Sequence, residues 1–374
     1  MEVIHFFKFP ITSFLFTILL LPVLIQLLKK YQILESPTQR KVHATHTPSL
    51  GGIVIFLGFI FTIILWWPEY LLAEYRLFVG AVILMFVIGL KDDLIPLKPW
   101  QKLISQFIPI LFLLFISDGI IQSLYGLLGV ESLNPWLAIP LTFFTILVIV
   151  NSVNLIDGAD GLASTICLSS ILILSFWFYF TGSENLAIVS RSFAGAILGF
   201  LVFNWKPAKI FMGDTGALVI GLVMAFLIVQ FLNLNSGLAV DNPYRVNGIS
   251  VALCLLFVPL FDTLRVFTIR VVNGRSPFKA DKNHIHHIFM RLGYSHSRLT
   301  IVLSSLNILF IAIAVLSSNF IEEVGLLFIV LMALIFSFIT EYMIVKSLAE
   351  LRGGERKSVL KLIKSTRSKQ SKAS

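Results

Sequence analysis

Residues 151–163 read N-S-V-N-L-I-D-G-A-D-G-L-A and separate two long apolar runs. An unpaired carboxylate is costly in hydrocarbon, so a stretch with this many polar groups must lie at a membrane edge or line a wet cavity. Asp157 and Asp160 are each followed by glycine, a pairing that is typical of turns. Because glycine accepts positive φ, such turns let the backbone and the carboxylates come close to a bound ion or phosphate. The stretch therefore predicts a turn between two membrane helices that contributes to a binding site.

Two other interpretations of this turn are a calcium loop and a purely structural connection. A calcium loop of the EF-hand type does not fit, because Ala159 occupies the third position and Leu168 the twelfth, where ligands are required. A structural polar turn between two helices remains the alternative when this loop is considered alone.

The composition of the chain indicates a membrane protein. Of its 374 residues 57% are hydrophobic and 13% are charged, and the mean hydropathy is +0.91. Soluble domains average about 25% charged residues. Cys167 and Cys254 both fall inside apolar runs without a partner at metal-binding spacing, so they favour neither a disulfide framework nor a zinc site. The first apolar run ends in Lys29-Lys30 with no small-residue cleavage site after it, which favours a retained span over a signal peptide.

Long apolar runs predict how often the chain crosses a membrane. A helix of about 20 apolar residues crosses the hydrocarbon core, and runs of about 16 to 22 residues count as spans. The sequence predicts eleven of them, near residues 12–28, 50–67, 72–90, 103–117, 136–150, 162–180, 187–204, 217–233, 248–269, 300–317 and 324–345. The expected fold is an all-α polytopic membrane protein of about eleven transmembrane helices, with its two ends on opposite sides.

The distribution of Lys and Arg predicts the orientation. Of 29 such residues, 24 fall in loops that follow odd-numbered spans or in the C-terminal tail. Since basic loops stay in the cytoplasm, the N-terminus is expected outside and the C-terminus inside. We expect one integral-membrane domain over residues 1–350 and a basic cytoplasmic tail over 351–374. The tail favours attraction to anionic membrane lipids and lacks the folded basic face with aromatics that nucleic-acid binding needs.

Two further acidic motifs fall in loops of the predicted cytoplasmic face. In K-D-D-L, the adjacent Asp92 and Asp93 would repel each other unless a cation or lysine offsets them. In F-M-G-D-T-G-A, Asp214 stands between two glycines just before a span. The N–H groups of a helix N-terminus favour phosphate at such a place, although the motif is not a P-loop. Interfacial anchoring by the first motif and helix capping by Asp214 are the structural alternatives.

A histidine-rich loop occupies residues 270–299 of the same face. The spacing of His284, His286 and His287 could suit a metal, but basic residues surround them. Neighbouring positive charges disfavour both a bound cation and imidazolium, so neutral imidazoles that donate to a phosphate fit better. A zinc site remains the alternative.

Asp262 and Arg265 are charged residues inside a predicted span. At positions i and i+3 of one helix they can reach each other, so we expect a structural ion pair. Such a pair would lie near the floor of a cytoplasmic cavity.

The acidic loops and the histidine loop together predict a site for a divalent metal and a polyanion. Mg²⁺ suits such a site, because it typically binds one or two carboxylates and completes its shell with phosphates and water. A site at the membrane surface can take one substrate from the cytosol and another from the bilayer. A secondary transporter of an anionic metabolite is the alternative of a different class, but it would place its charges near the midplane in broken, repeated helices.

These motifs, in this order, resemble the polyprenyl-phosphate N-acetylhexosamine-1-phosphate transferase family. The resemblance runs roughly from Arg40 to Ser297 and rests on R-K-V-H-A-T-H-T-P-S-L-G-G, K-D-D-L, N-S-V-N-L-I-D-G-A-D-G-L-A, N-W-K-P-A-K-I-F-M-G-D-T-G-A and H-I-H-H. It implies a multi-pass enzyme of the bacterial inner membrane that transfers a sugar 1-phosphate from a UDP-sugar to undecaprenyl phosphate and releases UMP. It also implies Mg²⁺ or Mn²⁺ as the cofactor. The oligomeric state stays open, with a homodimer as one candidate.

The resemblance also implies roles for single residues. Asp214 looks like the principal metal ligand, with Asp93 as a second one. Asp92 and Asp93 look like the acidic pair that positions or deprotonates the lipid phosphate, and Asp157, on the nucleotide and metal side, is counted with them as catalytic. The implied contacts to nucleotide, phosphate or sugar are Lys102, Asn151, Asn154, Asp160, Asn204, His284, His286 and His287.

Within this family the histidine motif resembles the branch that uses UDP-N-acetylglucosamine and initiates surface polysaccharide, O-antigen, enterobacterial antigen or teichoic acid. The branch that makes the first lipid-linked peptidoglycan precursor usually has a longer histidine run followed by Phe-Glu, whereas Ile288-Phe289-Met290 stands here. Ala44-Thr45-His46 also lacks the lysine often seen before Thr-Pro in that branch. N-acetylglucosamine 1-phosphate is therefore the expected group. Another UDP-N-acetylhexosamine or UDP-MurNAc-pentapeptide is the alternative donor.

The expected reaction is in-line phosphoryl transfer. An oxygen of the lipid phosphate attacks the β-phosphorus of the UDP-sugar and UMP leaves, with Mg²⁺ on Asp214 expected to spread the charge. The second pKa of a phosphate monoester is about 6, so the nucleophile is already mostly dianionic and Asp92 is expected to orient it rather than remove a proton. A covalent route through an aspartyl phosphate is the competing mechanism.

Overall fold

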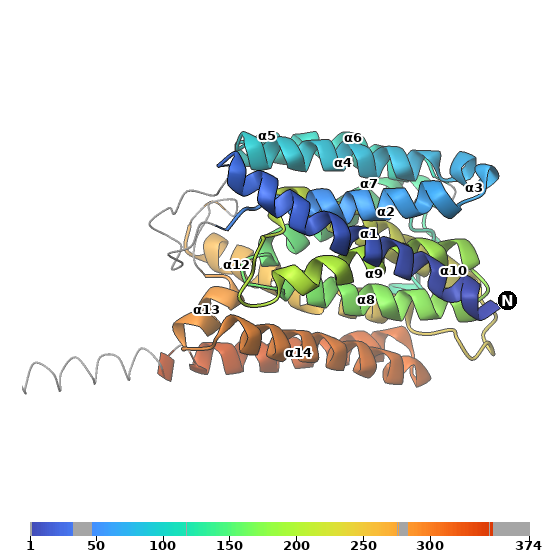
Figure 1. Ribbon diagram of the computed structural model, residues 1–374. Helices are drawn as coiled ribbons and strands as arrows, with labels where there is room; N and C mark the ends of the chain where they lie inside the picture. Colours follow the sequence, from blue (N-terminus) through green and yellow to red (C-terminus); the bar gives the residue numbers. More distant parts are fainter. Residues whose placement is uncertain are drawn as a thin grey trace, which may run out of the picture.

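The computed structural model describes residues 2–32, 47–116, 118–274, 276, 283–343 and 345–346. Within these ranges the chain is helical apart from its connections and one isolated antiparallel bridge between Ser123 and Ser132. Figure 1 shows the helices side by side in one elongated bundle. Three parts of the sequence predictions lie outside the described residues. They are residues 40–46, which begin the motif R-K-V-H-A-T-H-T-P-S-L-G-G, the lysines Lys279 and Lys282, and the tail at 351–374.

The helices follow one another with short connections. The first six are α1 (Glu2–Lys30), α2 (Gly52–Trp66), α3 (Glu69–Glu74), α4 (Arg76–Leu94), α5 (Pro99–Ser105) and α6 (Phe107–Leu114). A 3-10 turn at Leu127–Gly129 precedes α7 (Pro135–Ile156), α8 (Leu162–Phe180), α9 (Glu184–Asn204) and α10 (Gly213–Gly237). The last group is α11 (Gly248–Leu255), α12 (Phe257–Val272), α13 (Ile285–Arg291), α14 (His296–Leu316), a 3-10 turn at Ser317–Asn319, and a final helix, Glu322–Met343.

Each of the eleven predicted spans coincides with a helix or with two consecutive helices in the described part of the chain. Seven of these helices are long and apolar enough to cross a membrane, or eight if α11 and α12, which meet at 80°, form one broken span. Among the others, α2 has only 15 residues, and α5 and α6 are separate helices of 7 and 8 residues. The all-helical, multi-pass architecture is thus confirmed. The number eleven and the orientation stay predictions.

The stretch at 151–163 ends one helix and begins the next, as its composition predicts. Asn134 caps the start of α7 by accepting a hydrogen bond from the Trp136 amide, with proline at the first helical position. The helix stops at Asp157, whose ψ of 63° leaves the helical region. Gly161, at φ +72°, then sets the left-handed turn from which α8 starts. The break between the two apolar runs is therefore a tight turn at one end of the bundle.

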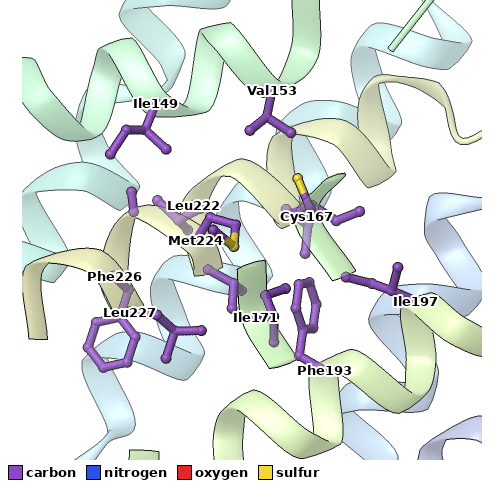
Figure 2. Close-up of a cluster of buried hydrophobic side chains, with 14 of the residues drawn as sticks. Ile149, Val153, Cys167, Ile171, Phe193, Ile197, Leu222, Met224, Phe226 and Leu227 are labelled. Carbon is purple, nitrogen blue, oxygen red and sulfur yellow. The ribbon is translucent and has the colours of Figure 1, made fainter. Parts of the chain in front are cut away.

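Helix α10 forms the centre of the bundle. In the most apolar 18-residue stretch of this helix 94% of the residues are buried, as expected for a helix that is hydrophobic on all sides. Figure 2 shows side chains from α7, α8, α9 and α10 packing together around Cys167 and Phe193. Cys167 and Cys254 are both free and buried. The element that carries Asp214 is thus held by neighbours on every side.

Small residues bring two other helices against the first turn of α10. A Cβ added to Gly89 on α4 would lie 2.6 Å from the Cα of Thr215. A Cβ added to Gly52 on α2 would overlap the backbone at Gly216. Only glycine permits these approaches, so the acidic end of α4 is placed directly beside Asp214.

Candidate active site

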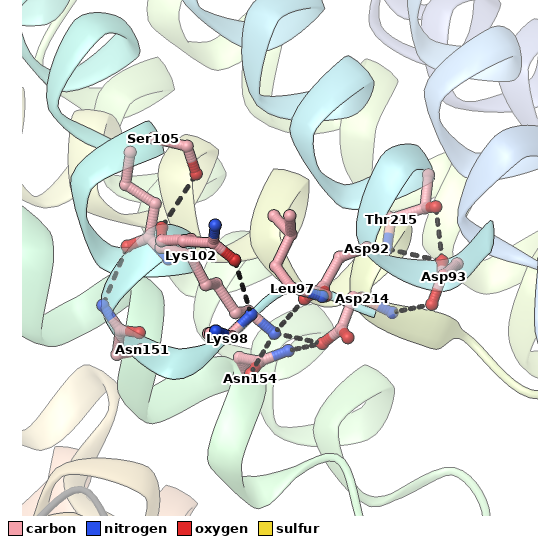
Figure 3. Close-up of polar contacts among 12 residues, drawn as sticks. Asp92, Asp93, Leu97, Lys98, Lys102, Ser105, Asn151, Asn154, Asp214 and Thr215 are labelled. Atoms are coloured by element: carbon pink, nitrogen blue, oxygen red, sulfur yellow. Dashed lines mark hydrogen bonds and ion pairs between the residues drawn. The ribbon is translucent and has the colours of Figure 1, made fainter. Parts of the chain in front are cut away.

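Lys102 joins the acidic motifs at one end of the bundle. Its Nζ lies 3.0 Å from Asp92 Oδ2 and 2.5 Å from Asp214 Oδ1. The same ammonium group donates to Asn154 Oδ1 at 3.1 Å (Figure 3). Lys102 on α5 therefore contacts one residue from each of α4, α10 and α7. Three helix ends that are distant in the sequence thus meet at one cation, which offsets the negative charge of Asp92 in K-D-D-L.

The amide side chains of α7 support this group. Asn154 Nδ2 donates to Asp214 Oδ1 at 2.5 Å, so this carboxylate oxygen has two donors, the amide and Lys102. One turn earlier, Asn151 Nδ2 donates at 2.8 Å to Oε1 of Gln106, which is fully buried at the break between α5 and α6. Asn151 thus fixes α5, which carries Lys102, against α7.

The two adjacent aspartates face different partners. Asp92 Oδ1 accepts from the Leu97 amide at 2.7 Å, and its other oxygen faces Lys102. Asp93 Oδ1 accepts from the Asp214 amide at 2.7 Å, and Oδ2 accepts from the amide and the hydroxyl of Thr215. Asp93 therefore caps the start of α10 from another helix, and it takes the N–H groups that were expected to favour phosphate.

Burial changes the proton affinity of these carboxyls, which lie beyond the predicted span 72–90. Burial raises the pKa of Asp93 to about 6, although the hydrogen bonds from Thr215 and Asp214 oppose the shift. Burial also raises the pKa of Asp92, against the opposing effects of the Leu97 amide and Lys102. The site thus holds its acidic groups in a partly desolvated place, where an added cation is attracted strongly.

Asp160 and Asn204 hold the Asp157–Gly161 turn in place. Asp160 Oδ1 lies 3.1 Å from His296 Nδ1 at the start of α14, and Oδ2 accepts from the Ala208 amide at 3.3 Å. Asn204 Oδ1 accepts from the Gly161 amide at 2.9 Å, and its Nδ2 donates to the carbonyl of Ile210. Both side chains are buried. They connect the turn to α14 and to the segment before α10, while Asp157 lies three residues after Asn154, at the end of α7.

The histidine loop packs against the same turn through α13. His284 Nδ1 lies 2.9 Å from Asp262 Oδ2. His286 is buried against Gly158, where an added Cβ would overlap its imidazole. Burial, and then the neighbouring histidines, lower the pKa of His286 well below its ordinary value, so this ring is neutral. His287, by contrast, is only partly buried.

The predicted ion pair between Asp262 and Arg265 is wrong. Asp262 instead accepts from His284 and from the Ile285 amide. Arg265 donates to the Asn283 carbonyl at 2.9 Å and lies 3.5 Å from Glu341. Both side chains turn toward the segment before α13, because the backbone and imidazole there supply partners that one helix face does not.

The acidic side chains of the site suit a metal ion that takes only one or two ligands from the protein and the rest from bound phosphates and water. Within the described ranges no group of three or more His, Cys, Asp or Glu residues could hold a metal ion alone, which gives the zinc alternative no support. Asp92 and Asp214 already hold one positive charge between them, that of Lys102. Mg²⁺ typically binds one or two carboxylates and completes its shell with phosphates and water, so these two residues fit it. Asp93 fits less well, because both its oxygens accept from α10.

Sequence reasoning missed four supporting residues: Gln106, Thr215, His296 and, as the partner of His284, Asp262. Asp262 carried a signal, since a carboxylate inside an apolar run requires a partner. The other three had no local signal. A glutamine at a helix break, a threonine after Asp214 and a histidine at a helix start acquire their partners only when separate helices meet.

Comparison with known proteins identifies the family. The model of the family described as Glycosyl transferase family 4 matches residues 75–232. The probable undecaprenyl-phosphate N-acetylglucosaminyl 1-phosphate transferase of Bacillus subtilis (strain 168) is 32% identical over 309 residues, which cover 80% of this chain and 81% of the relative. The chain belongs to this family. The resemblance expected from the motifs is thus confirmed.

Other proteins that are similar to this chain have related names. The decaprenyl-phosphate N-acetylglucosaminephosphotransferase of Mycobacterium tuberculosis (strain ATCC 25618 / H37Rv) is 33% identical over 295 residues, or 71% of each chain. The undecaprenyl-phosphate alpha-N-acetylglucosaminyl 1-phosphate transferase of Escherichia coli (strain K12) is 26% identical over 339 residues, 86% of this chain and 87% of the relative. The part matched by the family 4 model, 75–232, contains Asp92, Asn154 and Asp214, the three polar partners of the Lys102 ammonium group.

Proposed function

We propose that the chain transfers N-acetylglucosamine 1-phosphate from UDP-N-acetylglucosamine to undecaprenyl phosphate and releases UMP. The Bacillus and Escherichia relatives are named for this transfer to undecaprenyl phosphate. The observation that carries the proposal is the ammonium group of Lys102 between Asp92 and Asp214, at the end of an apolar helical bundle. A cation between carboxylates at this place can exchange contacts with a pyrophosphate. The proposed location is the bacterial inner membrane, where the lipid acceptor resides.

The reaction is proposed as an in-line displacement at phosphorus. An oxygen of the lipid phosphate forms a bond to the β-phosphorus of the UDP-sugar, and the bond to the UMP oxygen breaks. Lys102 neutralises charge that develops on the phosphate oxygens, and Asp92 orients the lipid phosphate through Lys102. No strong base is required, because the second pKa of a phosphate monoester is about 6. A covalent aspartyl phosphate would instead give exchange of labelled UMP into UDP-sugar without lipid.

The proposed metal site uses Asp214 and Asp92. Bound Mg²⁺, or Mn²⁺, would withdraw electron density from the pyrophosphate and ease departure of UMP. Asn154 holds the Asp214 carboxylate in place through the bond to Oδ1. Asp93 keeps the first turn of α10 fixed, so we assign it a supporting role in place of direct metal binding.

The Asp157–Gly161 turn and α13 are proposed to hold the nucleotide and sugar. Asp157 is assigned to the nucleotide and metal side, and Asp160 and Asn204 keep its turn in shape. Of the three histidines, His287 is the least buried, so we assign the phosphate or sugar contact to it. Assembly as a homodimer remains a prediction.

The direct test uses purified protein in lipid nanodiscs with Mg²⁺, undecaprenyl phosphate and single UDP-sugars, and it measures UMP release. UDP-N-acetylglucosamine is expected to be the best donor among UDP-N-acetylhexosamines and UDP-MurNAc-pentapeptide. UMP release from another donor alone would change the sugar but keep the reaction. No UMP from any donor, together with uptake of a labelled anionic metabolite into proteoliposomes, would favour a transporter.

A further inference from the structure

Two side chains of α12, one helical turn apart, hold the segment that leads into α13. Asp262 accepts two hydrogen bonds there, from His284 Nδ1 at 2.9 Å and from the Ile285 amide at 2.8 Å. One turn along α12, Arg265 donates from Nη1 to the carbonyl of Asn283 at 2.9 Å. Three consecutive residues, 283 to 285, are therefore tied to two residues of one helix. We call this arrangement the α12 clamp.

The clamp residues are buried, so the loss of any one hydrogen bond would leave a buried polar group without its partner. The exposed fractions of Asp262, His284 and Arg265 are 1%, 6% and 9%. A buried carboxylate that loses its donors keeps its desolvation cost, so these residues stabilise one placement of the segment. Because Asp262 occupies Nδ1 of His284 and the ring is almost fully covered, little of this imidazole is left for a substrate.

The position of α13 determines what lies beside the Asp157–Gly161 turn. Ile285 and Phe289 are buried on one side of the short helix. His286 follows the clamp directly and packs its ring onto Gly158. A shift of α13 would therefore move this ring out of contact with the turn, and it would move His287 with it.

We propose that His284 is a positioning residue for the transfer reaction and acts through Asp262 in the α12 clamp. This inference rests on the proposed function and goes beyond it, because it removes His284 from the substrate contacts that the histidine motif implied. The clamp places α13 against the Asp157–Gly161 turn, and the substrate contact is left to His287.

The two nitrogens of His284 can be tested separately. Asparagine places an amide where Nδ1 lies, so His284→Asn can still donate to Asp262. Glutamine places its amide near the position of Nε2 and loses that bond. We expect His284→Asn to keep at least a third of the wild-type kcat/KM for UMP release, and His284→Gln to lose about 10- to 100-fold. The opposite order would mean that Nε2 touches the substrate, and it would overturn the proposal.

Asp262 offers a matched pair of variants. Asp262→Asn keeps an acceptor for the Ile285 amide and can donate to the other tautomer of His284, so a loss of about threefold or less in kcat/KM is expected. Asp262→Leu keeps the volume but breaks both bonds, so a loss of about 10- to 100-fold is expected. Equal losses would indicate that the negative charge itself is required, which contradicts a positioning role.

Hydrogen exchange measured by mass spectrometry tests, without any substrate, whether the clamp holds the backbone of α13 in place. Amides of residues 283–291 should exchange about 10- to 100-fold faster in Asp262→Leu and His284→Gln, and within threefold of wild type in His284→Asn. Glu341→Gln, which changes only the longer contact to Arg265 at 3.5 Å, is the control and should leave the exchange unchanged. Unchanged exchange in Asp262→Leu would refute the clamp.

If that variant does not fold, the two His284 variants still decide the question. Absence of UMP release by the wild type would refute the proposed function and leave the exchange result to judge the clamp.

Discussion

Lys102→Met removes the ammonium group between Asp92 and Asp214 and keeps most of the side-chain volume. Two unit charges about 4 Å apart interact by about 4 kcal/mol at an effective dielectric constant of about 20. The side chains of Lys102 and Asp214 are 16% and 32% exposed. Screening by solvent should reduce the interaction to about 2–3 kcal/mol. If Lys102 stabilises phosphate charge in the transition state to this extent, kcat/KM should fall by about 30- to 160-fold.

The same variant should bind Mg²⁺ more tightly, because it removes a cation that competes for Asp92 and Asp214. This effect can be measured without turnover: a ligand that binds only the folded protein raises Tm as its concentration exceeds Kd. The Mg²⁺ concentration needed for a given Tm increase should be lower in Lys102→Met than in wild type. UMP release in nanodiscs at saturating Mg²⁺ measures the loss of activity.

Lys98→Met is the matched control, since Lys98 is an exposed lysine one turn before Lys102. It should change neither UMP release nor the Mg²⁺ dependence of Tm by more than twofold. The reasoning is refuted if Lys102→Met keeps kcat/KM within threefold of wild type, or if it needs more Mg²⁺ than wild type for the same Tm increase.

Three further predictions concern the support of the site. Asp93→Ala removes the cap on α10 and should lower the free energy of unfolding by about 1–2 kcal/mol, measured as a lower Tm, whereas an unchanged Tm would contradict the capping role. Gly158→Ala should overlap the His286 ring and reduce UMP release by at least about tenfold, and the added change His286→Ala should restore part of it if the overlap is the cause. His286 has a lowered pKa in the folded protein, so the unfolded chain takes up a proton first as the pH falls. Its contribution to stability is therefore complete above about pH 6.5 and is lost below it, and His286→Gln should flatten the acid side of a Tm against pH curve.

The sequence by itself determined the class of the protein and predicted the residues of the candidate site. Apolar runs of membrane length separated by polar turns require helices, because backbone groups in hydrocarbon must bond within their own segment. The residue types in the polar turns indicated phosphate and metal chemistry, and their order indicated the family. Asp92, Asn154 and Asp214 were predicted as site residues from these motifs and Lys102 from the family resemblance, and the four meet in the structure. These residues lie together because each of them stands at the end of a packed helix, and the ends of neighbouring helices are close to one another.

Only the tertiary structure decided which partner each polar group has. Asp92 and Asp93 are neighbours in the sequence, but successive residues of a helix point about 100° apart, so one faces Lys102 and the other faces α10. Asp262 had a plausible partner three residues away, yet it binds His284, 22 residues later. A hydrogen bond depends on positions within a few tenths of an ångström, and those are set by how α4, α10, α12 and α13 pack together. Sequence spacing constrains one helix at a time, and packing between helices places their side chains together.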